Sequence, residues 1–182
     1  MPSHITVLFW NVNKLGRIDR IREFLLDAVR RFDINLLLFA ECYNLPAITP
    51  AEGWHDGSLN SKIQLCYRED LRAFFEDINY KAEVMDGYIQ GLGASGIRVH
   101  GNSPGGVMLH LPSLNLVLTA VHLRSRLSSD PVTQYLEAQT VAEKVRRFQK
   151  GAHYGVIVGD FNMQPHEPGL THTHCFHSRT FP

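Results

Sequence analysis

The sequence predicts an α/β fold, a sandwich of two mixed β-sheets flanked by helices. Three observations support this class. Short apolar runs of strand type alternate with two long segments of helical period. Some runs are separated by a helical segment, which suits parallel crossovers, and two others are separated by a tight turn, which suits an antiparallel hairpin. We see no linker and no internal repeat, so one domain is expected.

The first part of the chain predicts a strand, a helix and a strand. Residues 5–10 (ITVLFW) form a β-rich run that ends at Asn11. Residues 34–40 (INLLLFA) are apolar throughout and too short for a helix, which indicates a strand covered on both faces. Between them, residues 17–32 carry an apolar stripe of helical spacing, typical of a helix packed on a sheet: Ile18, Ile21, Leu25, Ala28, Val29 and Phe32.

The middle of the chain predicts turns, strands and a long loop. Residues 52–60 (EGWHDGSLN) indicate a turn, and residues 63–70 (IQLCYRED) and 71–77 (LRAFFED) indicate two strands joined at a polar corner. Residues 87–106 are rich in glycine and predict a loop. Their GLGASG segment lacks the preceding strand, the following helix and the lysine of a phosphate-binding loop, so we interpret it as a connection.

The last part predicts a hairpin, a helix and a strand. Residues 106–111 (GVMLHL) and 114–121 (LNLVLTAV) flank a short turn and form the hairpin. A helix then begins at Pro131, with Ser129 or Asp130 as its N-cap, and continues toward Gly151. Residues 154–159 (YGVIVG) predict another buried strand. The helix carries an apolar stripe made of Val132, Tyr135, Ala142, Val145 and Phe148.

Composition excludes several classes of protein. Lysine plus arginine equals aspartate plus glutamate at 18 each, so the chain lacks the overall basic field of a dedicated nucleic-acid binder. Its three cysteines have no metal-site spacing and fit a reducing compartment. The first residues lack the features of a signal peptide, and no apolar run approaches the length of a membrane span. We therefore expect a soluble, cytoplasmic protein.

Polar side chains follow the ends of four apolar runs. Because strand ends meet at one edge of a sheet, and strands hold side chains rigidly, these residues are expected to form one cluster. They are Asn11, Glu41, His122 and Asp160, with Asn162 two residues further on.

The chemistry of these side chains is coherent. Glu41 offers the hard oxygen that Mg²⁺ prefers. Asp160 can orient or deprotonate a water, and His122 can hydrogen-bond or protonate an oxygen that gains charge. Asn11 and Asn162 offer amide donors to a phosphate oxygen. The set predicts metal-assisted hydrolysis of a phosphoester.

Each residue alone has a simpler interpretation. Asn11, Asp160 and Asn162 are types that commonly bond the backbone of their own turn. Glu41 could be the first solvated residue after a buried strand, and His122 could be a packed histidine. The joint occurrence of all five favours the catalytic interpretation.

Four segments, in this order, resemble the endonuclease/exonuclease/phosphatase superfamily of magnesium-dependent phosphoesterases: FWNVN, LLLFAE, LTAVHLRS and VIVGDFNMQP. GDFN followed by proline is the most specific of them. This resemblance implies a DNase I-like fold and an Mg²⁺ cofactor, for which Mn²⁺ could substitute. It also implies that the substrate is a phosphoester, with nucleic acid the leading expectation.

The resemblance also implies a role for each residue. Glu41 is then the magnesium ligand, and Asn11 contributes to the metal and phosphate site. His122 contacts the scissile phosphate, Asp160 orients the nucleophilic water, and Asn162 stabilises the transition state. Gln139 matches a glutamine of the family that we assign to structure.

The chain departs from the family pattern after GDFN. Family members continue to a closing Asp-His pair, but residues 166–182 (HEPGLTHTHCFHSRTFP) contain no aspartate. We therefore expect residues 1–165 to form a C-terminally truncated domain, and residues 166–182 to form a poorly structured, histidine-rich tail. A sheet edge left open in this way would favour self-association or a covering partner.

The tail has a second interpretation. Clustered imidazole and thiol groups can bind zinc, although their spacing here fits no recognised site, so an unstructured terminus is the preferred interpretation. The candidate zinc ligands are His166, His172, His174, Cys175 and His177.

The expected function is therefore that of a metal-dependent phosphoester hydrolase, a nuclease in its complete form. One alternative is a binding or assembly subunit that keeps the fold without turnover. Another is a phosphatase or a phospholipase-type phosphodiesterase.

Overall fold

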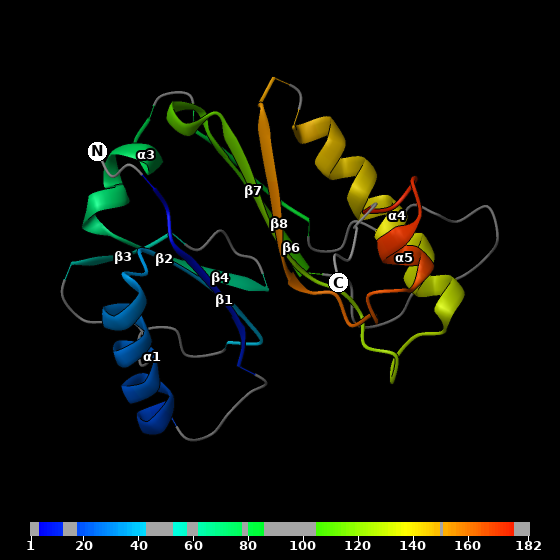
Figure 1. The fold of residues 1–182 in the computed structure, drawn as a ribbon, viewed down its shortest axis with the longest axis horizontal. Helices are drawn as coiled ribbons and strands as arrows, with labels where there is room; N and C mark the ends of the chain where they lie inside the picture. The colour runs from blue at the N-terminus through cyan, green and yellow to red at the C-terminus, as the bar shows by residue number, and fades with distance from the viewer. Residues whose placement is uncertain are drawn as a thin grey trace.

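Two four-stranded sheets form the centre of the fold (Figure 1). The computed structural model describes residues 4–12, 18–42, 53–57, 62–77, 80–85, 105–149 and 151–176. From one edge to the other, the first sheet contains β1 (Val7–Asn11), β2 (Leu36–Ala40), β4 (Ile63–Arg68) and β3 (Trp54–Asp56). The second contains β5 (Lys81–Val84), β6 (Gly105–Leu111), β7 (Leu116–His122) and β8 (Tyr154–Asp160).

Both sheets are mixed. In the first sheet β1 runs parallel to β2, while β4 is antiparallel to β2 and to β3. In the second sheet β7 and β8 are parallel, and β6 is antiparallel to β5 and to β7. The expected fold class, a sandwich of two mixed sheets, is confirmed.

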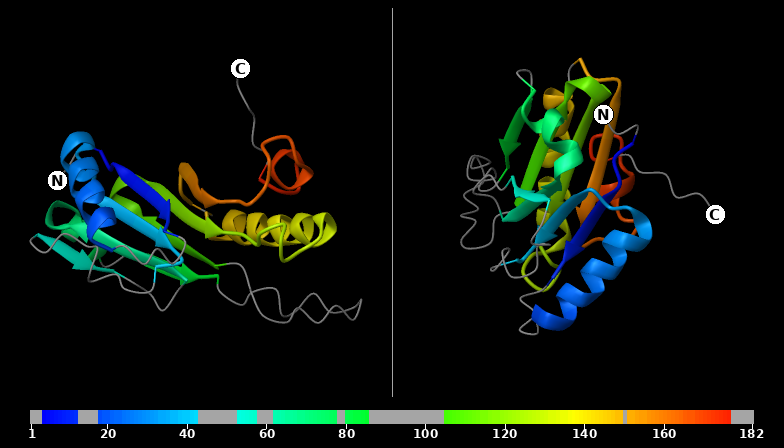
Figure 2. Two further views of the ribbon diagram at one scale, coloured as in Figure 1. Left: turned by 90° about the horizontal axis from the view of Figure 1, so that it is seen from below. Right: turned by 90° about the vertical axis from the view of Figure 1, so that its left-hand side faces the viewer.

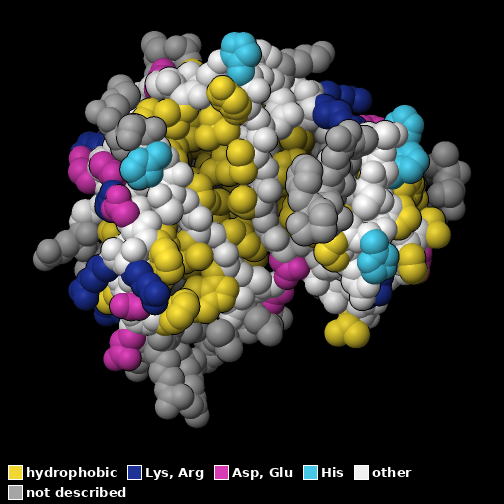
Figure 3. Space-filling view, viewed as in Figure 1, with side chains coloured by type: hydrophobic (Ala, Val, Ile, Leu, Met, Phe, Trp, Pro, Cys, Tyr) yellow, Lys and Arg dark blue, Asp and Glu magenta, His cyan; other side chains and the backbone are white. Residues whose placement is uncertain are grey.

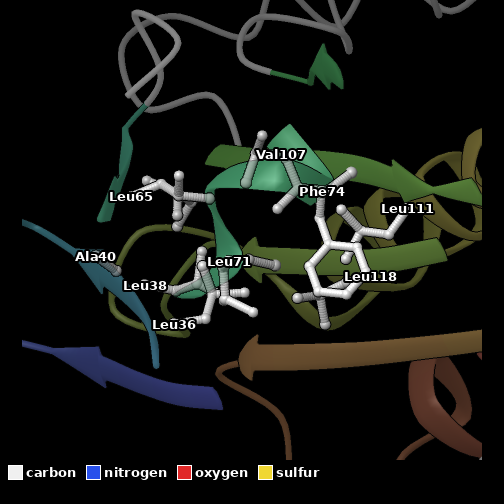
Figure 4. Close-up of a cluster of buried hydrophobic side chains, with 12 residues drawn as sticks. Leu36, Leu38, Ala40, Leu65, Leu71, Phe74, Val107, Leu111 and Leu118 are labelled. Carbon is white, nitrogen blue, oxygen red and sulfur yellow. The ribbon is translucent and has the colours of Figure 1, made fainter. Parts of the chain in front are cut away.

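The main hydrophobic core lies between the two sheets. Strand β2 shows why: Leu36, Leu38 and Ala40 face inward, while Leu37 and Phe39 face the opposite side, and all five are buried. This alternation is the side-chain period of a strand covered on both faces. Figure 4 shows the inward residues meeting side chains of the other elements, among them Leu65, Leu71, Phe74, Val107, Leu111 and Leu118.

Two helices cover the outer faces of the sandwich (Figures 1 and 2). Helix α1 (Ile18–Phe32) packs Leu25 and Ala28 against the outer residues of β2. Helix α4 (Pro131–Phe148) packs Val141 and Val145 against the outer residues of β6 and β7. Asp130 is the N-cap of α4, and its carboxylate accepts hydrogen bonds from the amides of Val132 and Thr133.

Each of the two predicted apolar stripes includes a residue that is not buried. Phe32 at the end of α1 and Val132 at the start of α4 are exposed. The Phe32 ring instead lies 5.3 Å from the guanidinium carbon of Arg31, a cation–π contact that suits a partly solvated aromatic ring. The side chains of Ile18 and Ile21 lie outside the described part of the chain.

The middle of the chain differs most from expectation. The turn expected around Trp54 is strand β3, which pairs with β4. The second expected strand is helical, with a 3₁₀ turn η1 (Glu69–Leu71) followed by α3 (Arg72–Phe75). Leu71 and Phe74, three residues apart, are both buried, so helical spacing rather than alternation describes this segment.

Strand β5 and the hairpin of β6 and β7 follow next along the chain. Strand β5 was not predicted, although its exposed Lys81 and Glu83 alternate with half-buried Ala82 and Val84, as in an edge strand. The expected hairpin of β6 and β7 is confirmed, and its turn is the 3₁₀ segment η3 (Pro112–Leu114). The GLGASG segment lies outside the described residues.

Strand β8 is not buried, contrary to expectation. Tyr154 is 66% exposed and Val156 is 44% exposed. Among the described residues β8 pairs with β7 alone, so it forms an edge of its sheet. Hydrophobic side chains also gather over β1 and between β1 and β8 on the face shown in Figure 3. An apolar edge of this kind favours pairing with another chain.

We expect this edge to support the self-association that the sequence suggests. In light scattering, the apparent mass should rise above that of one chain as protein concentration increases. Val156→Lys should lower it, because a lysine on an edge strand opposes pairing. A mass of one chain at every concentration, in both proteins, would show the idea to be wrong.

Candidate active site

The two sheets bring four of the predicted polar residues to the same end of the sandwich. His122 and Asp160 are paired neighbours at the ends of β7 and β8. Asn11 ends β1 opposite Ala40, and Glu41 follows Ala40 directly. Strands β1 and β8, from different sheets, are in contact. Their convergence places residues that are far apart in sequence beside one another.

The side chains of these four residues are in direct contact. The Asn11 amide Nδ2 donates a hydrogen bond to Asp160 Oδ2 at 2.9 Å. The His122 Nε2 atom lies 3.3 Å from Glu41 Oε1 and 3.4 Å from Asn11 Nδ2. Asn11 Nδ2 and His122 Nε2 lie within hydrogen-bonding distance, and the histidine tautomer decides their donor and acceptor roles. His122 and Glu41 lie at ion-pair distance.

The cluster is partly open to solvent. The side chains of His122 and Glu41 are 19% and 26% exposed, so a ligand can reach them although most of their surface is removed from water. Glu41 also has a φ of 53°, a left-handed conformation that is uncommon for a residue with a side chain. Such conformations cost about 1–3 kcal/mol and are concentrated at functional sites.

Asn162 joins the cluster through its backbone. Its N–H donates to Asp160 Oδ1 at 3.0 Å, and its side-chain Nδ2 donates to the Leu123 carbonyl oxygen at 2.8 Å. Asp160 and Asn162 therefore form an Asx turn, and the Asn162 amide bonds the loop after β7. A contact between the Asn162 side chain and a phosphate stays a prediction.

Gly159 is required where β8 meets β7. A Cβ atom at this position would collide with the Val121 carbonyl oxygen, and would lie 2.7 Å from Val121 Cγ2. Its φ of 157° is also one that L-residues rarely adopt. The glycine of GDFN thus lets Asp160 approach His122 across the strand pair.

A pocket of about 470 Å³ opens beside Asp160. It includes Arg126, which was not among the predicted site residues and which forms an ion pair with Glu167. The only hint of Arg126 in the sequence is the basic corner LRSR that follows β7. The pocket is lined by Ser125, Arg126, Gly159, Asp160, Phe161, Asn162, Met163 and Gln164.

Buried polar residues of α4 lie behind these loops and were also missed. Gln134 and Glu137 are almost completely buried. The Glu137 Oε2 atom accepts the Arg124 backbone N–H at 3.3 Å, and its Oε1 lies 3.7 Å from Arg124 Nε. Their burial could have been predicted from the sequence, because their helical spacing places them on the same face of α4 as the buried Ala138 and Val141.

Burial raises the pKa of the Glu137 carboxyl to about 7, although Arg124 and Lys62 act in the opposite direction. The unfolded chain ionises this group near pH 4.5, while the folded chain keeps the proton up to about pH 7. Rising pH through this window therefore favours unfolding. A glutamine here would have no proton to lose.

We expect the wild-type free energy of unfolding to fall by about 2 kcal/mol between pH 5.5 and pH 8 through Glu137 alone. Urea denaturation at the two pH values measures it, and Glu137→Gln should remove about this much of the decrease. The same pH dependence in both proteins would contradict the assignment.

The histidine-rich segment is described as far as Phe176. It contains α5 (Pro168–Thr171), and Leu170 and Cys175 are buried. Burial raises the pKa of the Cys175 thiol. His172 and His174 have ring centroids 5.2 Å apart. Within the described residues, no three His, Cys, Asp or Glu side chains are placed to hold a metal ion, and His177 lies outside them.

In the described part of the chain, no helix has the length and apolar character needed to cross a membrane.

Comparison with solved structures identifies the fold. The D. rerio TDP2 structure complexed with single strand DNA product has a TM-score of 0.62 at 12% identity, covering 93% of this chain and 64% of that one. An endonuclease/exonuclease/phosphatase family protein from Bacteroides thetaiotaomicron has a TM-score of 0.62 at 15% identity, covering 92% and 65%. A mannosyl-6-phosphatase of the same species has a TM-score of 0.62 at 15% identity, covering 93% and 70%.

These likenesses and the architecture define the class of fold: the chain has a DNase I-like fold, which it shares with the endonuclease/exonuclease/phosphatase family protein. The fold that the sequence resemblance implies is confirmed. The chain spans about two thirds of the length of these structures. No protein-family model and no curated sequence matches it.

Proposed function

We propose that this chain carries the catalytic site of a metal-dependent phosphoester hydrolase, and that its substrate is a nucleic acid. One observation carries the proposal. Asn11, Glu41, His122 and Asp160 come from four strands of two sheets and meet within hydrogen-bonding distance at one end of the sandwich. A structural role for any one of them would not require all four to meet.

The donor set of the cluster fits a hard divalent cation. Glu41 offers a carboxylate and Asn11 an amide oxygen, and neither is a soft ligand. Glu41 is also partly exposed, as a ligand of a partly hydrated Mg²⁺ must be. Glu41 and Asn11 would hold Mg²⁺ or Mn²⁺, which would neutralise charge on the phosphate oxygens.

The protein side chains would orient the water and stabilise the charge that develops on the phosphate. The Asp160 carboxylate is fixed by one hydrogen bond to each oxygen, from Asn11 and from the Asn162 amide. A carboxylate held in this way can orient a water for attack on phosphorus and accept its proton. His122, whose Nε2 atom lies 3.3 Å from Glu41 Oε1, can donate to a phosphate oxygen on which charge develops.

Two observations favour nucleic acid as the substrate. The pocket beside Asp160 combines cationic Arg126 with the aromatic Phe161, a pairing that suits a phosphate next to a flat base. A structure of the same fold, D. rerio TDP2, is complexed with single strand DNA product. A phosphatase is the second candidate, because a mannosyl-6-phosphatase also shares the fold.

The test is a substrate panel with Mg²⁺ and with EDTA. It contains single-stranded DNA, plasmid DNA, RNA, bis(4-nitrophenyl) phosphate and a sugar phosphate monoester. We expect cleavage of nucleic acid in Mg²⁺ and none in EDTA. Release of phosphate from the monoester alone would favour the phosphatase. Binding of DNA without hydrolysis of any substrate would favour the non-catalytic binding subunit and contradict the proposal.

A further inference from the structure

Gln134 is an unusual feature of the interior behind the candidate site. This residue of α4 is almost completely buried, at 2% exposure. Its Nε2 group donates to two backbone carbonyl oxygens, that of Arg124 at 2.9 Å and that of Asn162 at 3.3 Å. One side chain therefore uses both of its N–H hydrogens on two different loops.

Those two loops are the ones that follow the site strands. Arg124 lies two residues after His122 of β7, and Asn162 lies two residues after Asp160 of β8. The loops also bond each other, because the Leu123 N–H donates to the Asp160 carbonyl at 2.9 Å and the Asn162 side chain donates to Leu123. Gln134 connects this assembly to the helix packed on the sheet.

Burial of Gln134 is not explained by packing. Its Oε1 atom has no hydrogen-bond partner among the described residues, although it is buried. An unpaired buried acceptor is unfavourable, and an apolar side chain of the same size would avoid it. The two N–H donors of the amide therefore explain why a glutamine is buried at this position.

We infer that Gln134 is a positioning residue that sets the distance between the His122 loop and the Asp160–Asn162 loop. The inference rests on the proposed function, since it assigns Gln134 a role in that site's reaction. Gln134 acts through the two carbonyls and not on the substrate. Losing it should misplace the hydrolytic groups and leave ground-state binding nearly unchanged.

The variant Gln134→Met tests this role, because it keeps the length of the side chain and removes both donors. We expect kcat to fall at least ~10-fold and KM to stay within about twofold. Gln139→Leu, a comparable loss of an amide five residues further along α4, is the control and should keep both values. Equal kcat for Gln134→Met and wild type would overturn the inference.

Amide hydrogen exchange gives a readout that does not need hydrolysis. In Gln134→Met, the amides of Leu123 and Asn162 should exchange at least ~10-fold faster, while that of Leu118 in the middle of β7 keeps its rate. Unchanged exchange at Leu123 and Asn162 would refute the positioning role even if wild type hydrolyses nothing. A wild type without hydrolysis, combined with faster exchange, would instead refute the proposed function alone.

A second variant covers the case in which Gln134→Met does not fold. Gln134→Glu keeps the shape and polarity of the side chain but has at most one O–H donor, when protonated, for the two carbonyls. It should show the same local increase in exchange and the same fall in kcat. Wild-type exchange and kcat in Gln134→Glu would overturn the inference.

Discussion

Replacing Asp160 with asparagine should lower the rate of phosphoester hydrolysis by ~10³-fold, within the range expected when a general base is lost. Its two carboxylate oxygens accept from Asn11 Nδ2 and from the Asn162 amide, at 2.9 and 3.0 Å. An asparagine has the same shape but a single acceptor oxygen, so it can satisfy only one of these donors. It also lacks the negative charge needed to take a proton from water.

The control is Asp27→Asn, the same change at an exposed residue of α1, which should keep the wild-type rate. The measurement is the initial rate of hydrolysis at saturating Mg²⁺, with folding checked by circular dichroism. A folded Asp160→Asn protein whose rate is within about threefold of wild type would rule out a base or water-orienting role.

Replacing Gly159 with alanine should destabilise the fold by about 3 kcal/mol, because a steric clash adds to backbone strain. The added Cβ would collide with the Val121 carbonyl and lie 2.9 Å from its carbonyl carbon. Backbone atoms of the neighbouring strand cannot move away as a flexible side chain could. The pairing of β7 with β8, and with it the approach of His122 to Asp160, would be disturbed.

The variant Gly151→Ala measures the cost of backbone strain without a steric clash. Gly151 has a φ of 94°, and nothing lies within 4 Å of a Cβ built there. It should therefore lose only about 1 kcal/mol, the cost of a side chain in this backbone conformation. Urea denaturation compares the two variants. Equal losses would mean that the contact with Val121 does not limit position 159.

Much of the fold follows from periodicity that is visible in the sequence. The run from Leu36 to Ala40 is apolar at every position because β2 has a core on each face. The segment 71–77 resembles a strand because its aromatic residues also suit strands, while burial of Leu71 and Phe74 follows helical spacing. The exposure of β8 depends on its place at the sheet edge, which local sequence does not specify.

The candidate site was predictable in its members but not in its hydrogen bonds. Polar residues at four strand ends predict a cluster, because strand ends converge. The side-chain amide of Asn162 donates to the Leu123 carbonyl oxygen, a contact that depends on how two loops meet in space. The hydrogen bonds of Gln134 could not be predicted for the same reason, since its two acceptors come from segments that are distant in sequence.

The central claim is that Glu41 and Asp160 serve one hydrolytic site, although they belong to different sheets. The most direct test is a double-mutant cycle with Glu41→Gln and Asp160→Asn, read as the Mg²⁺-dependent rate of hydrolysis. Residues that act as a unit are strongly non-additive. We predict that the double variant is within about tenfold of the slower single variant. A double variant slowed by the product of the two single effects would contradict a shared site.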